Sequence, residues 1–245
     1  MPDAADHNER IRQYAAELGK QFEYGMPECM PRGEKIYDMV NSIHTGGLKT
    51  YSCHVMLCEA YPELIWECVP EVKEIARRTG IRQFVVSCMF SSEEMTGQYL
   101  PFLQKAAQSL KENDIILCYH NHHMDCIPFE HGKSAMDMVI EECPDCMIQL
   151  DAGWAWYGNM DVVRFMKEHG SRIASVHLKD LTADARERSD EGRFVAMGAG
   201  SAPIKEAVQL MPWCNIAPGK LIFDQDASTD IYADIKYGIK YVQNC

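Results

Sequence analysis

The sequence contains no long apolar run, and this absence excludes a membrane-spanning helix. No stretch of its 245 residues approaches the roughly 18 consecutive apolar residues that a helix needs to cross a bilayer. Residues 1–7 are largely polar, so we expect no secretion signal and predict a cytoplasmic protein. Hydrophobic residues make up 47% of the chain and charged residues 24%, proportions that are typical of a soluble globular protein.

Positive charge is scarce as well. The chain has 24 Lys and Arg residues against 36 Asp and Glu residues, which gives a formal net charge of −12. A surface of this sign disfavours binding to nucleic acid or to an anionic membrane. It does not exclude a small polar ligand, because a local site can bind one regardless of the net charge. We therefore expect a small-molecule partner, with no nucleic acid and no membrane.

Paired cysteine motifs are also lacking. The 11 cysteines are scattered and odd in number, so we expect reduced thiols rather than a disulfide framework. The segment Cys143-Pro144-Asp145-Cys146 is a lone C-x-x-C without the second pair that a zinc site would need. We interpret these two cysteines as incidental core or loop residues.

A glycine-rich phosphate loop is missing too, which disfavours a doubly wound nucleotide-binding sheet. Such a sheet would carry G-x-G-x-x-G after its first strand, whereas Gly198-Ala199-Gly200 lacks both the third glycine and a preceding apolar strand. Strand-type and helical segments instead alternate along the chain, which predicts βαβ units and a parallel sheet. The predicted strands are 20–25, 50–57, 82–90, 115–119, 147–150, 173–178 and 221–223. The predicted helices are 9–18, 34–42, 61–79, 93–113 with Pro101 as a point of interruption, 134–142, 161–169, 202–211 and 231–243.

This alternation predicts one α/β domain over residues 1–245, a (β/α)8 TIM barrel. The predicted strands are one fewer than a complete barrel has, and the deficit lies at the N-terminus, where the chain opens on a helix. We therefore expect a barrel in which the first strand is absent or truncated. Because such a gap exposes the edges of two strands, we expect either that the gene starts further upstream or that another segment or subunit fills the gap, as a homo-oligomer would.

Four predicted strands end in side chains that can bind metal or transfer protons. His120 begins the cluster His120-Asn121-His122-His123, Asp151 and His177 end two later strands, and Asp224 follows the last one. The carboxyl ends of barrel strands open on one face, so residues distant in sequence converge there. Mixed nitrogen and oxygen ligation favours manganese, zinc, cobalt or iron over magnesium or calcium.

Each of these residues also has an ordinary structural interpretation. The histidine cluster could be an exposed polar turn, and a single histidine such as His177 is more often a satisfied core residue than a ligand. Asp151 precedes Ala152-Gly153, where aspartate often only begins a turn. The recurrence of the same pattern at four strand ends favours the functional interpretation.

Further residues near the strand ends are candidates for binding substrate. His54 ends its own strand, and Glu23 lies near the end of the first predicted strand, so both could reach the same face. Trp154 follows Asp151 closely and could form a wall against the apolar face of a sugar. Lys179 follows His177, and a cation beside a metal is suited to stabilise an enolate or alkoxide oxygen.

At these residues the chain resembles the xylose isomerase-like TIM-barrel superfamily, the sugar phosphate isomerase/epimerase group. That group includes inosose dehydratase, tagatose and psicose 3-epimerases and dehydroshikimate dehydratase. The stretches that carry the resemblance, in the order of the superfamily, are Tyr119-His120-Asn121-His122, Leu150-Asp151-Ala152-Gly153-Trp154, Val176-His177-Leu178-Lys179-Asp180, Gly198-Ala199-Gly200 and Phe223-Asp224-Gln225-Asp226.

The resemblance implies a divalent metal ion, which could be manganese, zinc, cobalt, iron or magnesium. By position its ligands would be His120, Asp151, His177 and Asp224. Many members of the superfamily have glutamate in place of both His120 and Asp224, and in the epimerases these two glutamates move a proton on and off carbon. An aspartate is one methylene shorter, and proton transfer needs heavy atoms about 2.6–3.2 Å apart, so these departures put the ordinary epimerase mechanism in question.

These observations predict a metal-dependent isomerase or epimerase that acts on a sugar or a related polyol keto compound. His120, Asp224 and Lys179 are the predicted catalytic residues, and Glu23, His54, His122 and Trp154 are predicted to bind substrate. The alternatives are an inosose dehydratase-like lyase and a catalytically decayed sugar-binding or regulatory barrel. An endonuclease IV-type enzyme is disfavoured because the acidic chain lacks basic clusters.

Overall fold

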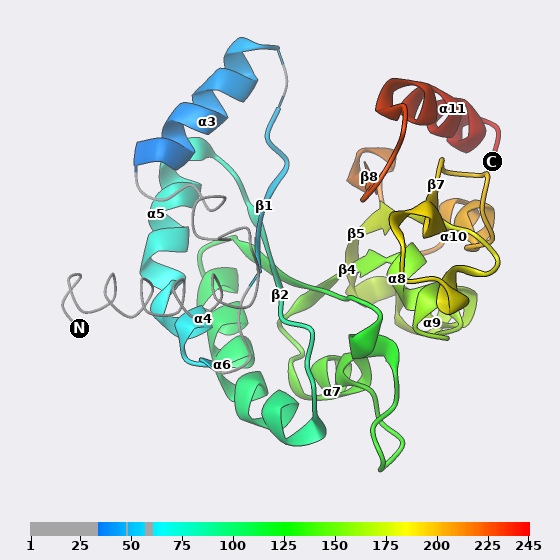
Figure 1. The fold of residues 1–245 in the computed structure, drawn as a ribbon. Helices are drawn as coiled ribbons and strands as arrows, with labels where there is room; N and C mark the ends of the chain where they lie inside the picture. Colours follow the sequence, from blue (N-terminus) through cyan, green and yellow to red (C-terminus); the bar gives the residue numbers. More distant parts are fainter. Residues whose placement is uncertain (1–33, 48, 57–60) are drawn as a thin grey trace.

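The fold is built on a curled sheet of six parallel strands. The computed structural model describes residues 34–47, 49–56 and 61–245. Within them the strand order is β1-β2-β3-β4-β5-β8, every neighbouring pair is parallel, and helices cover the outer face of the sheet (Figure 1). The strands are β1 (Ser52–Met56), β2 (Gln83–Ser87), β3 (Ile116–His120), β4 (Met147–Asp151), β5 (Ile173–Leu178) and β8 (Leu221–Phe223). This arrangement confirms a TIM-barrel fold in an incomplete form.

Six of the seven predicted strands are present, and their sequences explain why they pair in parallel. All five residues of β2 are buried, as are the last four residues of β3 and of β4. Strands buried on both faces are the ones that parallel α/β sheets require. The remaining predicted strand, 20–25, the predicted helix 9–18 and the candidate residue Glu23 lie outside the described residues.

The helices follow the predicted order, and most begin at a polar capping residue. Ser92, Ser134, Asp161 and Asp230 each accept a hydrogen bond from the backbone N–H three residues later, which satisfies a donor that the helix itself cannot. The helices are α3 (Glu34–Thr45), α4 (Leu64–Glu67), α5 (Val69–Thr79), α6 (Glu93–Lys111), α7 (Ala135–Glu142), α8 (Ala152–Tyr157), α9 (Val162–His169), α10 (Ile204–Leu210) and α11 (Ile231–Gln243). Short 3-10 turns are η1 (Met124–Cys126), η2 (Gly170–Arg172), η3 (Ala185–Glu187), η4 (Glu191–Arg193) and η5 (Pro218–Lys220).

Two helix predictions were wrong, and both concern proline. The single helix predicted over 61–79 is divided at Cys68 into α4 and α5, because Pro70 lies at the start of α5 and cannot continue a preceding helix. Conversely, α6 runs without interruption through Pro101. The residue four positions earlier is Gly97, and the following turns bury Leu103 and Leu110, so tertiary packing outweighs the hydrogen bond that the proline removes.

The region after β5 contains more structure than the predicted polar loop over 184–192. Strand β6 (Asp180–Leu181) pairs antiparallel with β7 (Phe194–Val195), and the turns η3 and η4 lie between them. Helix α8 was not predicted either. It begins directly after Asp151, whose carboxylate accepts a hydrogen bond from the backbone N–H of Trp154 at 2.7 Å. Together these elements form a layer of chain at the carboxyl ends of β4 and β5.

Two sequence motifs prove to be structural. Cys143 and Cys146 are free, buried thiols, and Arg172 donates hydrogen bonds to the backbone carbonyls of both residues. In the G-x-G segment, the backbone N–H groups of Gly198 and Gly200 each donate to the Asp180 carboxylate at 2.9 Å. The two glycine N–H groups are therefore already bonded within the protein.

Helix α11 exposes an unusual amount of apolar surface at the end of the sheet that carries β8. Its exposed apolar side chains are Ile231, Tyr232, Ile235, Tyr237 and Ile239. Such a surface is compatible with the predicted homo-oligomer, which stays a prediction. Among the described residues, no helix is both long and apolar enough to cross a membrane.

Candidate functional site

Three metal-competent side chains meet at the carboxyl ends of neighbouring strands. His120 is the last residue of β3, Asp151 the last of β4, and His177 the residue before the last of β5. Each offers one ligand atom, and these three atoms lie within 4.8 Å of one another. Asp151 and His177 are direct neighbours in the register between β4 and β5. Parallel strands that end together thus bring three of the four predicted ligands into one cluster, which we call the His-Asp-His trio.

A hydrogen bond fixes the orientation of His120. Its Nδ1 lies 3.1 Å from the side-chain oxygen of Gln149, which can only accept a hydrogen bond, so Nδ1 carries the proton. The lone pair of the ring is then on Nε2, which lies 4.0 Å from Asp151 Oδ2. Gln149 is held in turn by Ser175, whose hydroxyl accepts hydrogen bonds from Gln149 and Gln83 at 3.2 and 2.9 Å. Such a supporting partner orients a metal-ligating histidine and fixes its tautomer.

Asp151 shows most clearly that the cluster suits a cation. The residue is fully buried, and its Oδ1 is used as the cap of α8. Its Oδ2 is also buried and has no hydrogen-bond partner among the described residues, although Lys179 Nζ is 3.6 Å away. Burial raises the pKa of this carboxyl to about 6, against the opposing charge of Lys179. An unsatisfied carboxylate oxygen between two imidazoles fits zinc, manganese, cobalt or iron, which accept mixed nitrogen and oxygen ligands.

Asp224, the fourth predicted ligand, lies beside the trio. Its Oδ2 is 3.3 Å from His177 Nδ1 and 3.1 Å from Lys179 Nζ. Burial alone would raise the pKa of this carboxyl, but the hydrogen bond with His177 and the charge of Lys179 together hold it well below its usual value. The carboxylate is therefore charged at neutral pH. Its role as a ligand stays a prediction.

Lys179 is a buried cation surrounded by carboxylates. Its Nζ lies 2.8 Å from Asp226, 3.1 Å from Asp224 and 3.6 Å from Asp151. Burial alone would lower the pKa of the ammonium group, but the three carboxylates raise it above its usual value. The same Nζ lies 4.6 Å above the ring of Trp154, within the range of a cation–π contact. Lys179 thus stays protonated at the edge of the trio.

The remaining predicted residues that lie among the described ones also surround the trio. The His54 ring is 4.7 Å from the His120 ring, and the His122 ring is 5.1 Å from it, centroid to centroid. His54 Nε2 also lies 3.1 Å from the Ser87 hydroxyl. The Trp154 ring is 6.3 Å from that of His122. Four strands and the α8 turn therefore contribute side chains to one site, and only Glu23 falls outside the described residues.

The electrostatics of the site favour neutral imidazoles. Burial, followed by the charge of Lys179, lowers the pKa of His122 to about 4. Desolvation, followed by the charge of His177, lowers the pKa of His54 to about 4, and burial holds that of His120 well below its usual value. Neutral imidazoles retain the lone pair that metal binding and proton abstraction both require.

A comparison with known protein families matches residues 65–212, more than half of the chain, to the family described as xylose isomerase-like TIM barrel. The chain belongs to this family. Inosose dehydratase from Geobacillus kaustophilus (strain HTA426) is 24% identical over 216 residues, which cover 83% of this chain and 64% of that protein. The chain therefore spans less than two thirds of the length of this curated relative.

Solved structures of low sequence identity share the fold. A sugar phosphate isomerase/epimerase from Parabacteroides distasonis ATCC 8503 has a TM-score of 0.68 at 17% identity, over 84% of this chain and 80% of that chain. The IOLI protein, solved with a bound zinc atom, has a TM-score of 0.66 at 12% identity, over 93% of this chain and 90% of that chain. Structural similarity at such low sequence identity shows that the fold is shared and shows nothing about activity.

Several residues that support the site were not predicted from the sequence. Asn121 connects two strand ends, because its side chain accepts a hydrogen bond from Asp151 N at 3.0 Å and donates one to Asp151 O at 3.2 Å. Asp125 accepts a hydrogen bond from His122 N at 2.8 Å. Gln149 supports His120 through its side-chain oxygen. Asn121 and Asp125 stand close to predicted site residues in the sequence, but only the folded structure gives them partners.

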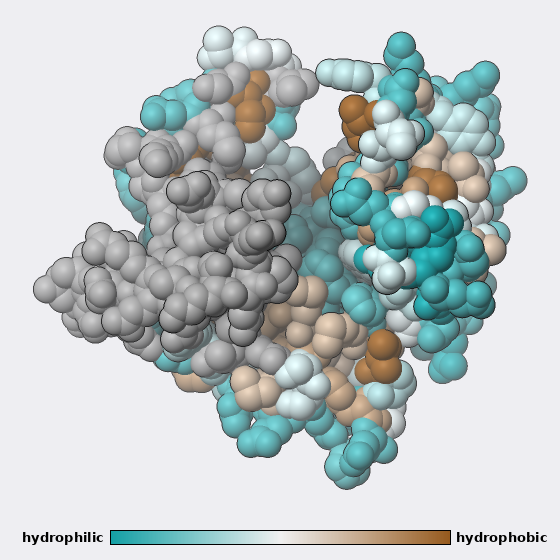
Figure 2. Space-filling model, viewed as in Figure 1, coloured by the Kyte–Doolittle hydropathy of each residue, from teal (hydrophilic) through white to brown (hydrophobic). Residues whose placement is uncertain are grey.

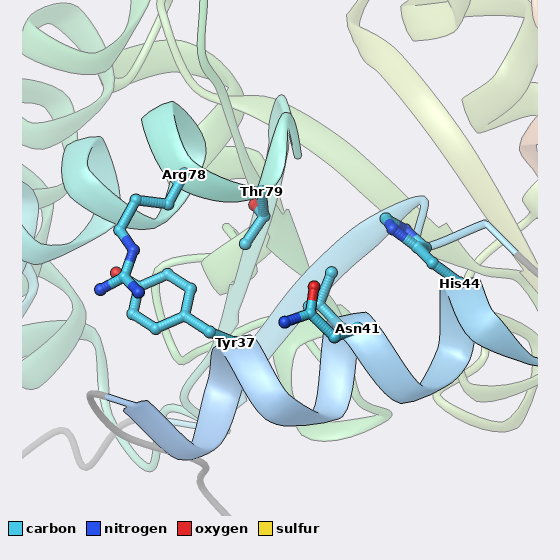
Figure 3. A pocket seen from close by; sticks show the side chains of 6 residues that line it. Tyr37, Asn41, His44, Arg78 and Thr79 are labelled. Carbon is cyan, nitrogen blue, oxygen red and sulfur yellow. The ribbon is translucent and has the colours of Figure 1, made fainter.

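A small pocket on the outer side of the sheet is separate from this site. It measures about 140 Å³ and is lined by residues of α3 and of the end of α5 (Figure 3). Arg78 lies 3.3 Å from the centre of the Tyr37 ring, and His44 Nε2 accepts a hydrogen bond from Thr50 N at 3.4 Å. None of its lining residues comes from a strand end, so the pocket contributes nothing to the chemistry of the trio. By contrast, Figure 2 shows a hollow with hydrophilic residues between the α3–β1 and β8–α11 sides of the molecule.

Replacing Gln149 with methionine is expected to weaken zinc affinity by about 10- to 100-fold, the usual cost of losing a partner that orients a ligating histidine. Methionine has nearly the same length, but it cannot hold the His120 tautomer. Affinity would be measured on chelator-treated protein by competition with a chromophoric chelator. Gln98→Met, at an exposed position on α6, is the matched control and should bind zinc as the wild type does. Unchanged affinity in the Gln149 variant would remove Gln149 from the site.

Proposed function

We propose that the protein is a divalent-metal-dependent isomerase or epimerase that acts on a sugar or a related polyol keto compound. The observation that carries the proposal is the His-Asp-His trio with its unsatisfied Asp151 oxygen, bordered by the buried ammonium group of Lys179. Membership of a family that includes sugar isomerases, epimerases and dehydratases supports an enzymatic role for this protein. The solved neighbour with bound zinc makes zinc the first metal to test.

The trio would hold the metal through His120 Nε2, an oxygen of Asp151 and a ring nitrogen of His177. When bound, a divalent cation acts as a Lewis acid on a substrate carbonyl and makes the neighbouring C–H more acidic. Asp224 would be the fourth ligand or would stay bonded to His177. With Nδ1 directed at Gln149 and Nε2 holding the metal, His120 would have no nitrogen left for the proton transfer predicted for it.

His122 is the best placed base for that proton. Its Nδ1 is buried and has no hydrogen-bond partner among the described residues, and the neutral ring can accept a proton. Lys179 would stabilise the oxygen on which negative charge develops, through a preorganised cation in a partly dry site. His54 would bind a substrate hydroxyl, and Trp154 would pack against the apolar face of the sugar.

A dehydratase is the second candidate, and the 24% identical inosose dehydratase favours it. Elimination next to a carbonyl begins with removal of the same α-proton, so both reactions share their first step. They differ in the second step, because the isomerase or epimerase returns the proton whereas the dehydratase expels a neighbouring hydroxyl group. A decayed binding barrel is the third possibility, and metal content distinguishes it from both enzymes.

The proposal is tested by metal content together with proton exchange. Chelator-treated protein would be reloaded with zinc or manganese, and the metal that remains after gel filtration would be counted by mass spectrometry. Deuterium uptake from D2O at the α-carbon of ketoses and inososes would be followed by NMR, and a new alkene signal would indicate dehydration. His177→Ala should lose both the metal and the exchange. The matched control His131→Ala, an exposed histidine paired with Glu93 at 2.8 Å, should keep both. Absence of stoichiometric metal in the wild type would contradict the proposal.

A further inference from the structure

Arg193, at the edge of the site, is a cation with no hydrogen-bond partner among the described residues. Among the described arginines, six donate hydrogen bonds to carboxylates or backbone carbonyls; they are Arg77, Arg82, Arg164, Arg172, Arg186 and Arg188. No described residue accepts a hydrogen bond from the Arg193 guanidinium group, and its Nε is buried and unsatisfied. A buried donor of this kind costs free energy unless a ligand satisfies it.

Aromatic rings surround the guanidinium group of Arg193. Its central carbon lies 5.0 Å from the ring centre of Phe194, 5.7 Å from that of Tyr157 and 5.8 Å from that of Trp154. These ring contacts restrain the planar group but use none of its N–H donors. An arginine that rests on aromatic rings keeps its in-plane donors for carboxylate or phosphate oxygens.

The backbone around Arg193 is also held in place. Arg193 O accepts a hydrogen bond from Thr182 N at 2.9 Å, and Phe194 pairs with Leu181 in the β6–β7 ladder. Arg193 lies in the connection between β6 and β7, residues 182–193. Arg186, in the same connection, donates hydrogen bonds to the backbone carbonyls of Trp156 and Tyr157 in α8. The connection is therefore fastened to the helix that begins at Asp151. A preorganised cation loses little conformational entropy when it binds an anion.

Trp154 links Arg193 to the metal-competent trio. The same indole ring contacts Lys179 Nζ at 4.6 Å and the guanidinium carbon of Arg193 at 5.8 Å. His123 lies beside the same rings, and its centroid is 5.3 Å from Trp154 and 5.1 Å from Tyr157. A substrate that packs on Trp154 with one end at the trio can therefore extend its other end toward Arg193.

We propose that Arg193 binds an anionic group of the substrate, a carboxylate or a phosphate, at the end remote from the trio. The proposal rests on the proposed function for the identity of the trio as the reacting end. In a chain with a net charge of −12, an anionic substrate needs a local cation to bind. Lys179 does not supply the cation for this remote group, because it lies at the reacting end beside the trio, where it contacts three carboxylates. The substrates would thus be acidic keto sugars or sugar phosphates rather than neutral sugars.

Binding without turnover tests this inference. The affinities of chelator-treated wild-type protein for D-fructose, D-fructose 6-phosphate and D-glucuronate would be measured by ligand-observed NMR. At least one of the two charged compounds should bind about tenfold or more tightly than D-fructose, as a charge-assisted hydrogen bond allows. Whichever of them is preferred identifies the anionic group as a phosphate or a carboxylate. Because neither metal nor catalysis is needed, failure to bind metal would contradict the proposed function and leave this comparison intact.

Substitutions at Arg193 and Arg188, both in the β6–β7 connection, show whether the preference for charged ligands depends on Arg193. Arg193→Met, which keeps the stacking chain but removes the charge, should lose the preference for the charged ligand, and Arg193→Lys should keep part of it. Arg188→Met removes an arginine from the same connection whose guanidinium group is already bonded to Asp190 at 3.0 Å, so the preference should persist. If Arg193→Met does not fold, Arg193→Gln replaces it. Equal binding of all three ligands by the wild type, or a preference that survives the loss of the Arg193 charge, would overturn the inference.

Discussion

Replacing Lys179 with methionine is expected to lower the unfolding free energy of the metal-free protein by about 3–5 kcal/mol, the usual cost of breaking a buried ion pair from one side. The Lys179 side chain is 4% exposed, and Asp151 is fully buried. Methionine fills much of the space of the lysine chain, but it leaves three carboxylates without the cation that they surround. Because Asp224 and Asp226 are 29% and 34% exposed, water offsets part of this loss, and the lower end of the range is the expected result.

The effect of this substitution on metal affinity should have the opposite sign. In the metal-free site the ammonium group lies 3.1 Å from Asp224 and 3.6 Å from Asp151, where it competes with a cation for the same oxygens. Without it, zinc should bind at least as tightly as in the wild type and should restore part of the lost stability by mass action. Proton exchange at carbon should nevertheless fall by about 10²- to 10³-fold, as when one donor to a developing oxyanion is removed.

Urea denaturation with and without zinc, together with chelator competition, measures both effects. Lys111→Met is the matched control, since Lys111 is 68% exposed and pairs with Asp145 at the surface. Its loss should cost at most about 1 kcal/mol, the upper end for exposed ion pairs. An equal loss of stability in the Lys179 variant with and without zinc would show that the ammonium group and the metal do not share the same carboxylates.

The convergence of the site could be predicted from the sequence because each of these strands passes from apolar residues to a histidine or an aspartate at its carboxyl end. Buried apolar segments end at His120, at Asp151 and near His177, and parallel pairing then brings those ends together. Strand 173–178 and helix 231–243 were predicted with the observed bounds, since clear apolar segments and a capping Asp230 mark them. The same pattern placed His54, His122 and Trp154 around the trio, although their roles remain predictions.

Residues whose roles depend on partners distant in the sequence could not be predicted in this way. Gln149 looks like an isolated polar residue inside a strand, and only the register with β3 and β5 places it between His120 and Ser175. Helix α8 was missed because Gly153 lies near its start and the element has only six residues. Arg193 was missed because the ladder that holds it consists of two residues on each side. Tertiary contacts, rather than local propensity, determine all three.

Replacing Asp125 with alanine is expected to lower the unfolding free energy by about 3–5 kcal/mol, because each buried donor left unpaired costs about 1–3 kcal/mol before the chain relaxes. The carboxylate is fully buried and accepts hydrogen bonds from Phe90 N at 3.0 Å, from the Tyr119 hydroxyl at 3.1 Å and from His122 N at 2.8 Å. These bonds tie the segment after β2 to the turn that carries His122. Asp125 is therefore expected to position the proposed base as well as to stabilise the fold.

Tyr119→Phe separates these two effects, since it removes the hydrogen bond from the Tyr119 hydroxyl and leaves the backbone donors of Phe90 and His122 satisfied. It should cost about 1 kcal/mol, the net value of a typical hydrogen bond. Urea denaturation measures the stability of both variants, and hydrogen exchange measures protection of the Phe90 and His122 amides. In Asp125→Ala these two amides should exchange faster while the amides of β3 stay protected, because the turn is released locally. If the aspartate variant lost no more stability than the tyrosine variant, the backbone donors must find other acceptors, and Asp125 would not be what holds His122 in place.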